Sequence, residues 1–392
     1  MSIRPSQSTL DIIRKLIEFD TVSRNSNLAL IEWVRTYLSA HGVDSTLILD
    51  EEGKKANLFA TIGPAAVPGV VLSGHTDVVP VDGQAWTVEP FVMTERDGRL
   101  FGRGICDMKS FIGAVLAAVP DFVRAQLETP VHIALTYDEE VGCRGIPSLL
   151  QFMRDNAVAP RLCIIGEPTE MKIVVAHKGN TRYRCVVHGL ECHSALADQG
   201  VNAVEAAAEL VARLKSVARQ KSTKGPFDRA FSPPYTTVHT GLIHGGTAMN
   251  IVPNHCYFDF EIRYIPEDDP APVLEELKRF ARNVLEPEMH SVSPATGIEF
   301  LHKSDLPGLS TSEDADGVSF AKALRSNPVL DKISFGTEGG HYQASGIPSI
   351  VCGPGSIEQA HKPDEWIELA EIAACEEFLA RLGESLAVGK RD

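Results

Sequence analysis

The chain has 392 residues, of which 44% are hydrophobic and 23% are charged, and its 37 basic and 52 acidic residues give a net charge of −15. A chain of this size and apolar content can bury a large core, which excludes a wholly disordered protein. The acidic balance argues against a nucleic-acid-binding protein, although a local arginine could still bind an anionic small molecule.

The sequence shows no membrane-spanning or signal segment. Its longest apolar stretch covers about residues 111–120, which is too short to span a bilayer. The N-terminal segment carries charges throughout and lacks the apolar centre of a signal peptide. The eight cysteines are scattered without a C-x-x-C pair, which favours reduced thiols over disulfides. We therefore expect a cytoplasmic protein that binds neither membranes nor nucleic acid.

The first third of the chain alternates helical and strand patterns. Apolar residues recur at helical spacing over 10–17, where Ser8 or Thr9 is the expected N-cap, and again over 30–38. Later helical patterns lie at 109–127, where Pro120 is expected to break or kink the helix, and at 145–155. The predicted buried strands are 69–73, 132–137 and 162–165. This alternation predicts a mainly parallel sheet that is covered by helices on both faces.

The middle third has a different pattern, in which strands show alternating exposed and buried faces. This combination of elements predicts a small α+β domain. The predicted elements are a strand at 181–188, a helix at 201–217, a surface loop at 221–234, a strand at 257–264, a helix at 272–284 and a strand at 297–301.

The last part of the chain returns to the first pattern. It contains a predicted buried strand at 348–352 and a predicted helix at 368–386. We therefore expect an α/β domain formed by residues 1–180 and 304–392, with an α+β domain of residues 181–303 inserted into it.

Acidic and imidazole side chains follow several of the predicted strands or lie in short polar motifs. Ligands of open α/β sheets bind beyond the carboxyl ends of the strands, so these side chains should converge there. Taken singly, each is more often a solvated surface group, but together they favour a pair of divalent metal ions, with zinc as the default. They are His75, Asp77, Asp107, Glu139, Glu140, Glu167 and His361.

A pair of metal ions roughly 3.5–4 Å apart needs a bridging carboxylate and further ligands on each ion. Asp107 could bridge the two ions. His75, Glu167, Glu140 and His361 could then complete the two ions.

Two carboxylates remain beside these ligands. Asp77 could accept the second ring N–H of His75 and fix its tautomer, or it could cap a helix. Glu139 could be an unligated general base, although a solvated surface carboxylate is the alternative.

Five motifs resemble the M20 family of metallo-aminopeptidases and deacylases, and they occur in order along nearly the whole chain. Within this family, the stretch 335–366 is most similar to the acetylornithine deacetylases. The motifs are SGHTDVVP (73–80), GRGICDMKS (102–110), DEEVG (138–142), GEPT (166–169) and GPGSIEQAHKPDEW (353–366).

The resemblance implies a zinc-peptidase-like catalytic domain with an inserted dimerisation or lid domain, and therefore a homodimer. It implies two divalent metal ions per subunit, Zn²⁺ by default or Co²⁺ in its place. It also implies that His75 and Glu167 complete one ion and that Glu140 and His361 complete the other, with Asp107 as the bridge. Glu139 would be the general acid and base.

The resemblance extends to the predicted inserted domain. His193 matches a family histidine that reaches into the active site of the partner subunit. Asn250 and Arg263 match substrate-binding positions. Gly339 and Gly340 could let the substrate approach the backbone closely, although an ordinary turn is the alternative.

The implied reaction is hydrolysis of the amide bond of an N-acyl amino acid. The substrate would be N2-acetyl-L-ornithine, which would give L-ornithine and acetate in arginine biosynthesis. Succinyl-diaminopimelate desuccinylases, aminoacylases and dipeptidases share the site, but those desuccinylases usually carry Ser-Asp-Gly-Arg where this chain has Thr337–His341. In this stretch, Glu338 could face the ornithine ammonium or be a solvated loop residue. A catalytically inactive binding homologue would lack a ligand or the base, and all of these are present.

Overall fold

The computed structural model describes residues 4–387, which fall into two units. Unit 1 consists of Met1–Ala176, Leu309–Lys332 and Thr337–Asp392, and unit 2 consists of His177–Gly308 and Ile333–Gly336. Unit 2 is therefore inserted into unit 1 along the sequence, and each unit is described by itself. None of the described helices is long and apolar enough to cross a membrane.

Unit 1 is built on a nine-stranded sheet with the order β1-β2-β6-β3-β7-β15-β8-β13, in which β14 also pairs with β8. The central neighbours β6, β3, β7 and β15 are parallel, whereas β1, β2 and β8 pair antiparallel. The strands are β1 (Ser45–Leu49), β2 (Ala56–Ile62), β3 (Val70–His75), β6 (Val131–Thr136), β7 (Leu162–Pro168), β8 (Ile173–His177), β13 (Leu309–Ser310), β14 (Leu330–Ile333) and β15 (Ser349–Gly353).

Helices cover this central sheet. Every residue of β3, β6, β7 and β15 is buried, as expected for parallel strands with both faces covered. Helix α3 packs against both α1 and α10, and α9 packs against β7 and β15. The helices of unit 1 are α1 (Gln7–Ile17), α2 (Leu28–Ala40), α3 (Ser110–Arg124), α4 (Ile146–Asp155), α8 (Asp316–Ala323), α9 (Gly339–Ala344) and α10 (Leu369–Leu386).

A small antiparallel sheet completes unit 1. Its strand order is β16-β5-β4, with β4 at Thr94–Arg96, β5 at Arg99–Phe101 and β16 at Trp366–Glu368. It is continuous in sequence with two of the motifs, because β5 directly precedes the GRG turn and β16 begins at Trp366, the last residue of the HKPDEW segment.

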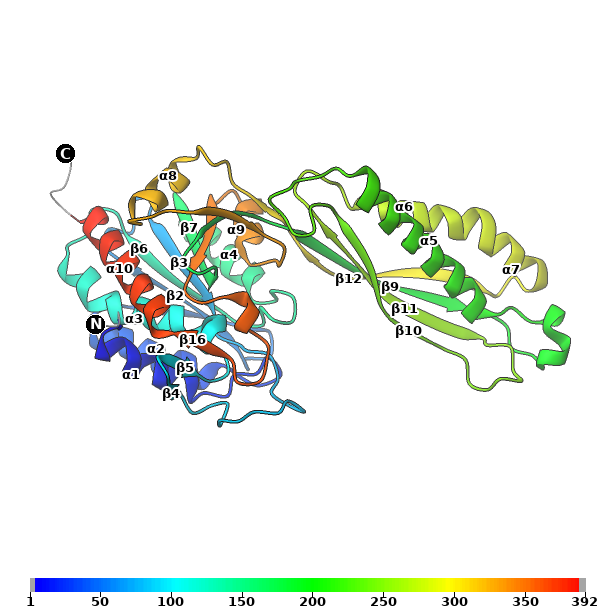
Figure 1. Ribbon diagram of the computed structural model, residues 1–392, viewed down its shortest axis with the longest axis horizontal. Coiled ribbons are helices and arrows are strands. Elements are labelled where there is room, and N and C mark those ends of the chain that lie inside the picture. Colours follow the sequence, from blue (N-terminus) through cyan, green and yellow to red (C-terminus); the bar gives the residue numbers. More distant parts are fainter. Residues whose placement is uncertain (1–3, 388–392) are drawn as a thin grey trace. The chain divides into compact units, whose positions relative to one another are not determined.

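Unit 2 is an antiparallel sheet with the order β10-β11-β9-β12, packed against the helices α5 and α6 (Figure 1). Along β11 the side chains of Phe258, Phe260 and Ile262 are buried with α5, while polar residues alternate with them. The elements are β9 (Gly179–His188), α5 (Ala203–Lys224), β10 (Thr237–Gly245), β11 (His255–Tyr264), α6 (Ala271–Phe280), α7 (Glu286–Val292) and β12 (Gly297–Leu306).

Three local expectations are wrong. The N-cap of α1 is Ser6, whose hydroxyl accepts the N–H of Thr9, and not Ser8 or Thr9. Helix α3 is not broken at Pro120 but runs on to Arg124. The Tyr37 hydroxyl donates to the carbonyl of Leu116, which loses its usual N–H partner four residues on. The expected loop at 221–234 begins only after α5, which ends at Lys224.

The broad prediction of an α/β protein is confirmed. The structure has a large, mainly parallel sheet flanked by helices and a separate antiparallel sheet with its own helices.

Candidate metal centre

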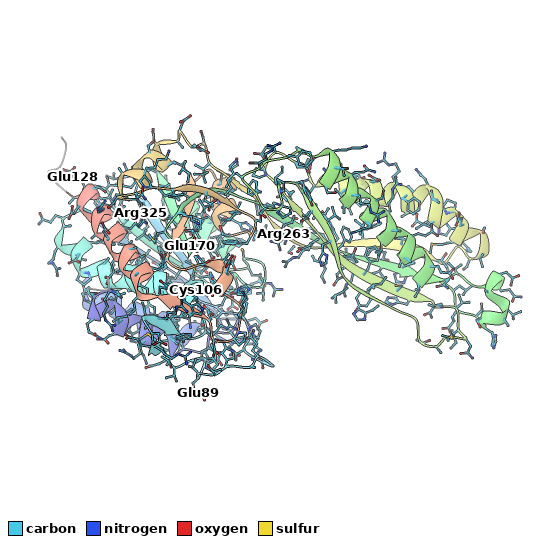
Figure 2. All side chains as sticks on the ribbon, in the orientation of Figure 1. Glu89, Cys106, Glu128, Glu170, Arg263 and Arg325 are labelled. Carbon is cyan, nitrogen blue, oxygen red and sulfur yellow. The ribbon has the colours of Figure 1, made fainter. Side chains whose placement is uncertain are left out.

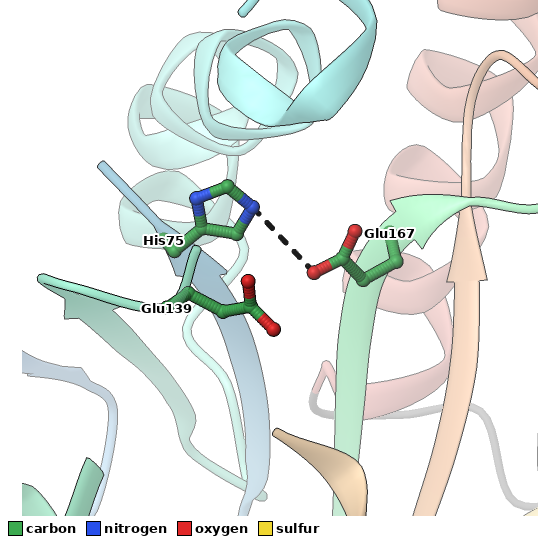
Figure 3. A group of neighbouring side chains, drawn as sticks. All are labelled: His75, Glu139 and Glu167. Carbon is green, nitrogen blue, oxygen red and sulfur yellow. Dashed lines mark ion pairs between the residues drawn. The ribbon is translucent and has the colours of Figure 1, made fainter. Parts of the chain in front are cut away.

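Three neighbouring parallel strands bring a histidine and two glutamates to the same edge of the sheet. His75 is the last residue of β3, Glu139 follows the end of β6 by three residues, and Glu167 is the penultimate residue of β7. Figure 3 shows their side chains pointing toward one another. Because the carboxyl ends of parallel strands meet at one edge, distant parts of the sequence converge here.

The Asp107 carboxylate lies between two histidines. Its Oδ1 is 2.9 Å from Nε2 of His75, and its Oδ2 is 3.3 Å from Nε2 of His361. Each carboxylate oxygen therefore faces a different imidazole. This is the arrangement that a carboxylate needs in order to bridge two metal ions.

Two further carboxylates accompany the histidines. Glu167 Oε1 is 3.5 Å from Nε2 of His75 (dashed line in Figure 3), and Glu140 Oε2 is 3.0 Å from Nε2 of His361. These imidazole nitrogens and carboxylate oxygens, without a thiolate, are a donor set that suits Zn²⁺ or Co²⁺. Among the described residues, two groups place ligand atoms within 4.8 Å of one another: His75, Glu139 and Glu167, and His75, Asp107 and Glu140.

Most of these side chains are buried, so they are not solvated surface groups. The exposed fractions of His75, Asp107 and Glu167 are 1%, 5% and 4%, whereas the side chain of His361 is half exposed. Several carboxylates in one buried site repel one another and lose hydration. The cluster is therefore a site that cations would stabilise.

The titration of the cluster reflects this crowding. Burial raises the pKa of Glu167 and of Glu139 well above the ordinary value, and the neighbouring carboxylates add to the increase. Burial alone would also raise the pKa of Asp107, but hydrogen bonds from His361 and His75 hold it well below its ordinary value. Hydrogen bonds to Asp107 and Glu140 raise the pKa of His361 to about 10. Metal binding at this imidazole would therefore release a proton.

The Asp77 carboxylate holds the turn that carries the two adjacent glutamates. It accepts the N–H of Glu139 at 3.0 Å, the N–H of Glu140 at 3.4 Å and the hydroxyl of Ser23 at 2.6 Å. His75 Nδ1 lies 2.9 Å from the main-chain oxygen of Asp77 and 3.6 Å from its carboxylate. Asp77 thus contacts the imidazole mainly through its backbone and the glutamate turn through its side chain.

The glycines of the TEGG segment begin a helix. Gly339 and Gly340 are the first two residues of α9 and are buried, and the Gly339 N–H donates to Oγ1 of Thr337 at 3.0 Å. Glu338 is 1% exposed, and burial raises its pKa to about 7. The alternative that Glu338 is a solvated loop residue is therefore wrong.

The three predicted substrate-binding or catalytic residues of the middle segment lie in unit 2. His193 is exposed, and its Nδ1 accepts the N–H of Ala195 at 3.0 Å. Asn250 lies beside it, because its carbonyl accepts the N–H of Ser194. Arg263 lies on β11, labelled in Figure 2, and its Nε donates to Glu261 at 3.3 Å.

Two further side chains that contact the cluster were not expected from the sequence. The thiol of Cys143 donates to Oε1 of Glu139 at 3.5 Å, and the Glu365 carboxylate accepts the N–H of Asp107 at 3.0 Å. Their positions were the available signal, because Cys143 directly follows the DEEVG motif and Glu365 lies inside HKPDEW.

Comparison with known sequences agrees with the family that the motifs suggested. Residues 71–385 match the protein family described as Peptidase family M20/M25/M40. The chain is 35% identical over 374 residues to an acetylornithine deacetylase of Myxococcus xanthus, covering 94% of this chain and 95% of that protein. It is 33% identical over 389 residues to an acetylornithine deacetylase of Proteus mirabilis strain HI4320, covering 97% of each.

Solved structures share the fold. Aminopeptidase PepT from Bacillus cereus is similar with a TM-score of 0.74 at 20% identity, covering 98% of this chain and 99% of that one. The YXEP protein of Bacillus subtilis, described as a dinuclear metal binding peptidase, has a TM-score of 0.69 at 17% identity, covering 96% and 97%. These likenesses support the fold class.

Proposed function

This chain belongs to the M20 peptidase family, as its motifs suggested, and we propose that it hydrolyses N2-acetyl-L-ornithine to L-ornithine and acetate. The observation that carries the substrate assignment is the 32–35% identity to several acetylornithine deacetylases over nearly their whole length. The observation that supports the reaction type is the Asp107 carboxylate between His75 and His361.

The proposed cofactor is a pair of divalent ions, Zn²⁺ by default or Co²⁺ in its place. Asp107 would be shared by both ions, His75 and Glu167 would hold one, and Glu140 and His361 would hold the other. When bound, such ions polarise a carbonyl group and lower the pKa of water. The distances between these side chains support the grouping, and the pairing with each ion follows the family.

The proposed base is Glu139, which lies beside the ligands His75 and Glu167. It would accept a proton from the water that adds to the acetyl carbonyl carbon. As the C–N bond breaks, the same carboxyl group would give that proton to the leaving amine nitrogen. Acetate and the free amino acid are then the products, and both proton transfers use one side chain.

The roles proposed for unit 2 follow from the family resemblance. His193 would donate a hydrogen bond to the developing oxyanion in the active site of the partner subunit, which implies a homodimer. Arg263 and Asn250 would bind the α-carboxylate of the substrate. Residues 181–303 would then be the dimerisation or lid domain. In unit 1, Gly339 and Gly340 would lie where the substrate passes close to the backbone.

The biological setting is part of the same proposal. Release of ornithine would place the enzyme in arginine biosynthesis, and the cytoplasm is the predicted location. The eight cysteines, all free in the structure, are compatible with a reducing compartment.

A substrate panel tests the assignment. The metal-loaded protein is assayed for amine release from N2-acetylornithine, N-acetylmethionine, N-succinyl-diaminopimelate and a dipeptide. We expect the highest kcat/KM for N2-acetylornithine. A higher kcat/KM for any other member would overturn the substrate while leaving the reaction type in place. If no member is hydrolysed with both metals bound, an untested acyl class would be favoured before the inactive binding homologue.

A further inference from the structure

Glu365 is a buried carboxylate around which the turn before Asp107 is folded. Its Oε1 accepts the N–H groups of Cys106 at 2.8 Å and Asp107 at 3.0 Å. Its Oε2 accepts the N–H of Gly104 at 2.9 Å and the Arg103 guanidinium at 2.7 Å. These four bonds fill the acceptor sites of the carboxylate. The backbone of Asp107 is therefore anchored directly, and Cys106 (labelled in Figure 2) is anchored beside it.

A second set of contacts leads from this turn to His361. Arg103 donates to Oε1 of Gln84 at 2.6 Å, and Nε2 of Gln84 donates to the main-chain oxygen of His361 at 3.0 Å. Trp86 supports this link, because its Nε1 donates to Oε1 of Gln84 and its ring lies 5.0 Å from the Arg103 guanidinium. Glu365 itself follows His361 by four residues, so the contacts form a closed loop.

His361 depends on such support more than the other proposed ligands do. Its side chain is half exposed, and its backbone has the left-handed φ of +63°, which is uncommon outside glycine. Packing around the ring is therefore sparse. The hydrogen bond from Gln84 to its carbonyl is a contact that fixes this strained backbone in place.

We propose that Glu365 is a positioning residue that, with Arg103 and Gln84, sets the separation of the Asp107 carboxylate and the His361 imidazole before metal binds. The inference rests on the proposed function in taking Asp107 and His361 as metal ligands. A buried ion pair by itself adds little to stability, because desolvation offsets the attraction. Partners that orient metal ligands typically change metal affinity by about 10–100-fold.

Two variants test the network at its His361 end and at its Asp107 end separately. Gln84→Met keeps the length and neutrality of the side chain but removes the donor to His361. Because Gln84 is partly exposed, this variant should fold. Glu365→Gln replaces one carboxylate oxygen with an NH2 group. This group cannot accept a hydrogen bond from the backbone N–H groups at the Asp107 turn. The matched control is Glu368→Gln, three residues on, where an exposed carboxylate pairs with Arg99 at 3.3 Å.

The measurement is zinc affinity of the metal-stripped full-length protein, by competition with a chromophoric chelator, together with its thermal unfolding. For Gln84→Met we expect one zinc to bind about 10–100-fold more weakly while the other changes little, and kcat to recover at saturating zinc. For Glu365→Gln we expect both sites to weaken, because Asp107 is shared. Glu368→Gln should bind zinc as the wild type does.

The proposal is overturned if Gln84→Met binds both zinc ions with wild-type affinity, even if its unfolding temperature falls. If Glu365→Gln does not fold, the zinc affinity of Gln84→Met alone tests the proposal. Zinc affinity is measured without substrate, so an error in the substrate assignment would not affect it. Wild-type protein that bound no zinc would instead refute the proposed metal centre.

Discussion

Glu139 and Glu140 are adjacent in sequence but have different neighbours. Glu140 lies 3.0 Å from His361, whereas Glu139 groups with His75 and Glu167. The Asp77 carboxylate accepts both of their backbone N–H groups and so fixes the turn on which they diverge. Two identical side chains can therefore serve as ligand and as base.

The proposed base can be tested by an isosteric change. Glu139→Gln removes the carboxylate that would move the proton and keeps the size of the side chain. We expect kcat to fall by about 10²–10⁴-fold while two metal ions remain bound. Steady-state kinetics and elemental analysis measure the two quantities. Glu52→Gln, on the surface, is the control. Loss of metal together with ordinary turnover would defeat the role of Glu139.

Glu338 gives a prediction about pH. Burial raises its pKa from 4.5 to about 7 in the folded protein. Between these values the folded state holds a proton that the unfolded state has released, so the free energy of unfolding falls as pH rises. Glu338→Gln should remove this loss and stabilise the metal-stripped protein above pH 7 by an amount on the order of 3 kcal/mol. Urea unfolding at about pH 5 and pH 8 measures it. Parallel pH dependence of the two proteins would show that Glu338 titrates normally.

Among the elements, β7 packs closely against α3 and β15 beside the site. A Cβ atom on Gly166 would lie 2.1 Å from the ring of Phe111 in α3, and one on Gly353 in β15 would lie 2.0 Å from the carbonyl oxygen of Gly166. Strands β7 and β15 and helix α3 therefore approach one another closely at Gly166, the residue that precedes the proposed ligand Glu167. A single glycine thus couples core packing to the site.

This coupling predicts the effect of Gly166→Ala. The added methyl group must displace Phe111 or the strand, which should cost about 1–3 kcal/mol of unfolding free energy. The displacement should also weaken zinc binding through Glu167. Denaturant unfolding and zinc titration measure both effects. In the control Gly297→Ala, the nearest atom to the new Cβ is 4.0 Å away. Unchanged stability and unchanged zinc affinity in Gly166→Ala would contradict this account.

Elements with a strong local signal were predictable from the sequence. The buried strands β3, β6 and β7 are continuous apolar runs, and they lie at or near their predicted positions. Strand β10 was missed because TVHTGLIHG mixes polar residues and glycines without a clear period. In α3, the Leu116 carbonyl that Pro120 cannot pair accepts a hydroxyl from Tyr37, a tertiary contact that local patterns do not contain.

In the candidate site, too, features with a local signal were predictable and tertiary contacts were not. The positions of His75, Glu139 and Glu167 after or within apolar runs predicted that they would converge, because parallel strands end at one edge. The orientation of the Asp107 oxygens and the anchoring by Glu365 were not predictable. Glu365 and Asp107 are 258 residues apart, and only the folded chain brings them together.

For the whole molecule, the proposed residues are divided between the units. Unit 1 contains the proposed metal ligands and Glu139, and unit 2 contains His193, Asn250 and Arg263. By the family resemblance, His193 would reach the active site of a partner subunit. In this proposal, the homodimer would therefore take part in catalysis as well as in assembly.

Subunit mixing tests this idea. His193→Ala and Glu139→Gln should each be nearly inactive alone. In a hybrid dimer, one of the two sites has an intact Glu139 and an intact partner histidine. Random exchange should therefore restore about a quarter of the wild-type activity. The measurement is the acetate-release rate after mixing, with each variant mixed with itself as control. Activity that stays at the level of the separate variants would argue against catalysis by His193 across subunits.

We propose that two metal ions in the cluster around Asp107 enable this chain to hydrolyse N2-acetylornithine. The most direct measurement is the rate of acetate release from that substrate as zinc or cobalt is added to metal-stripped protein. The account predicts almost no release without metal and a rate that reaches its plateau at about two equivalents per subunit. Undiminished acetate release after complete removal of metal would contradict it.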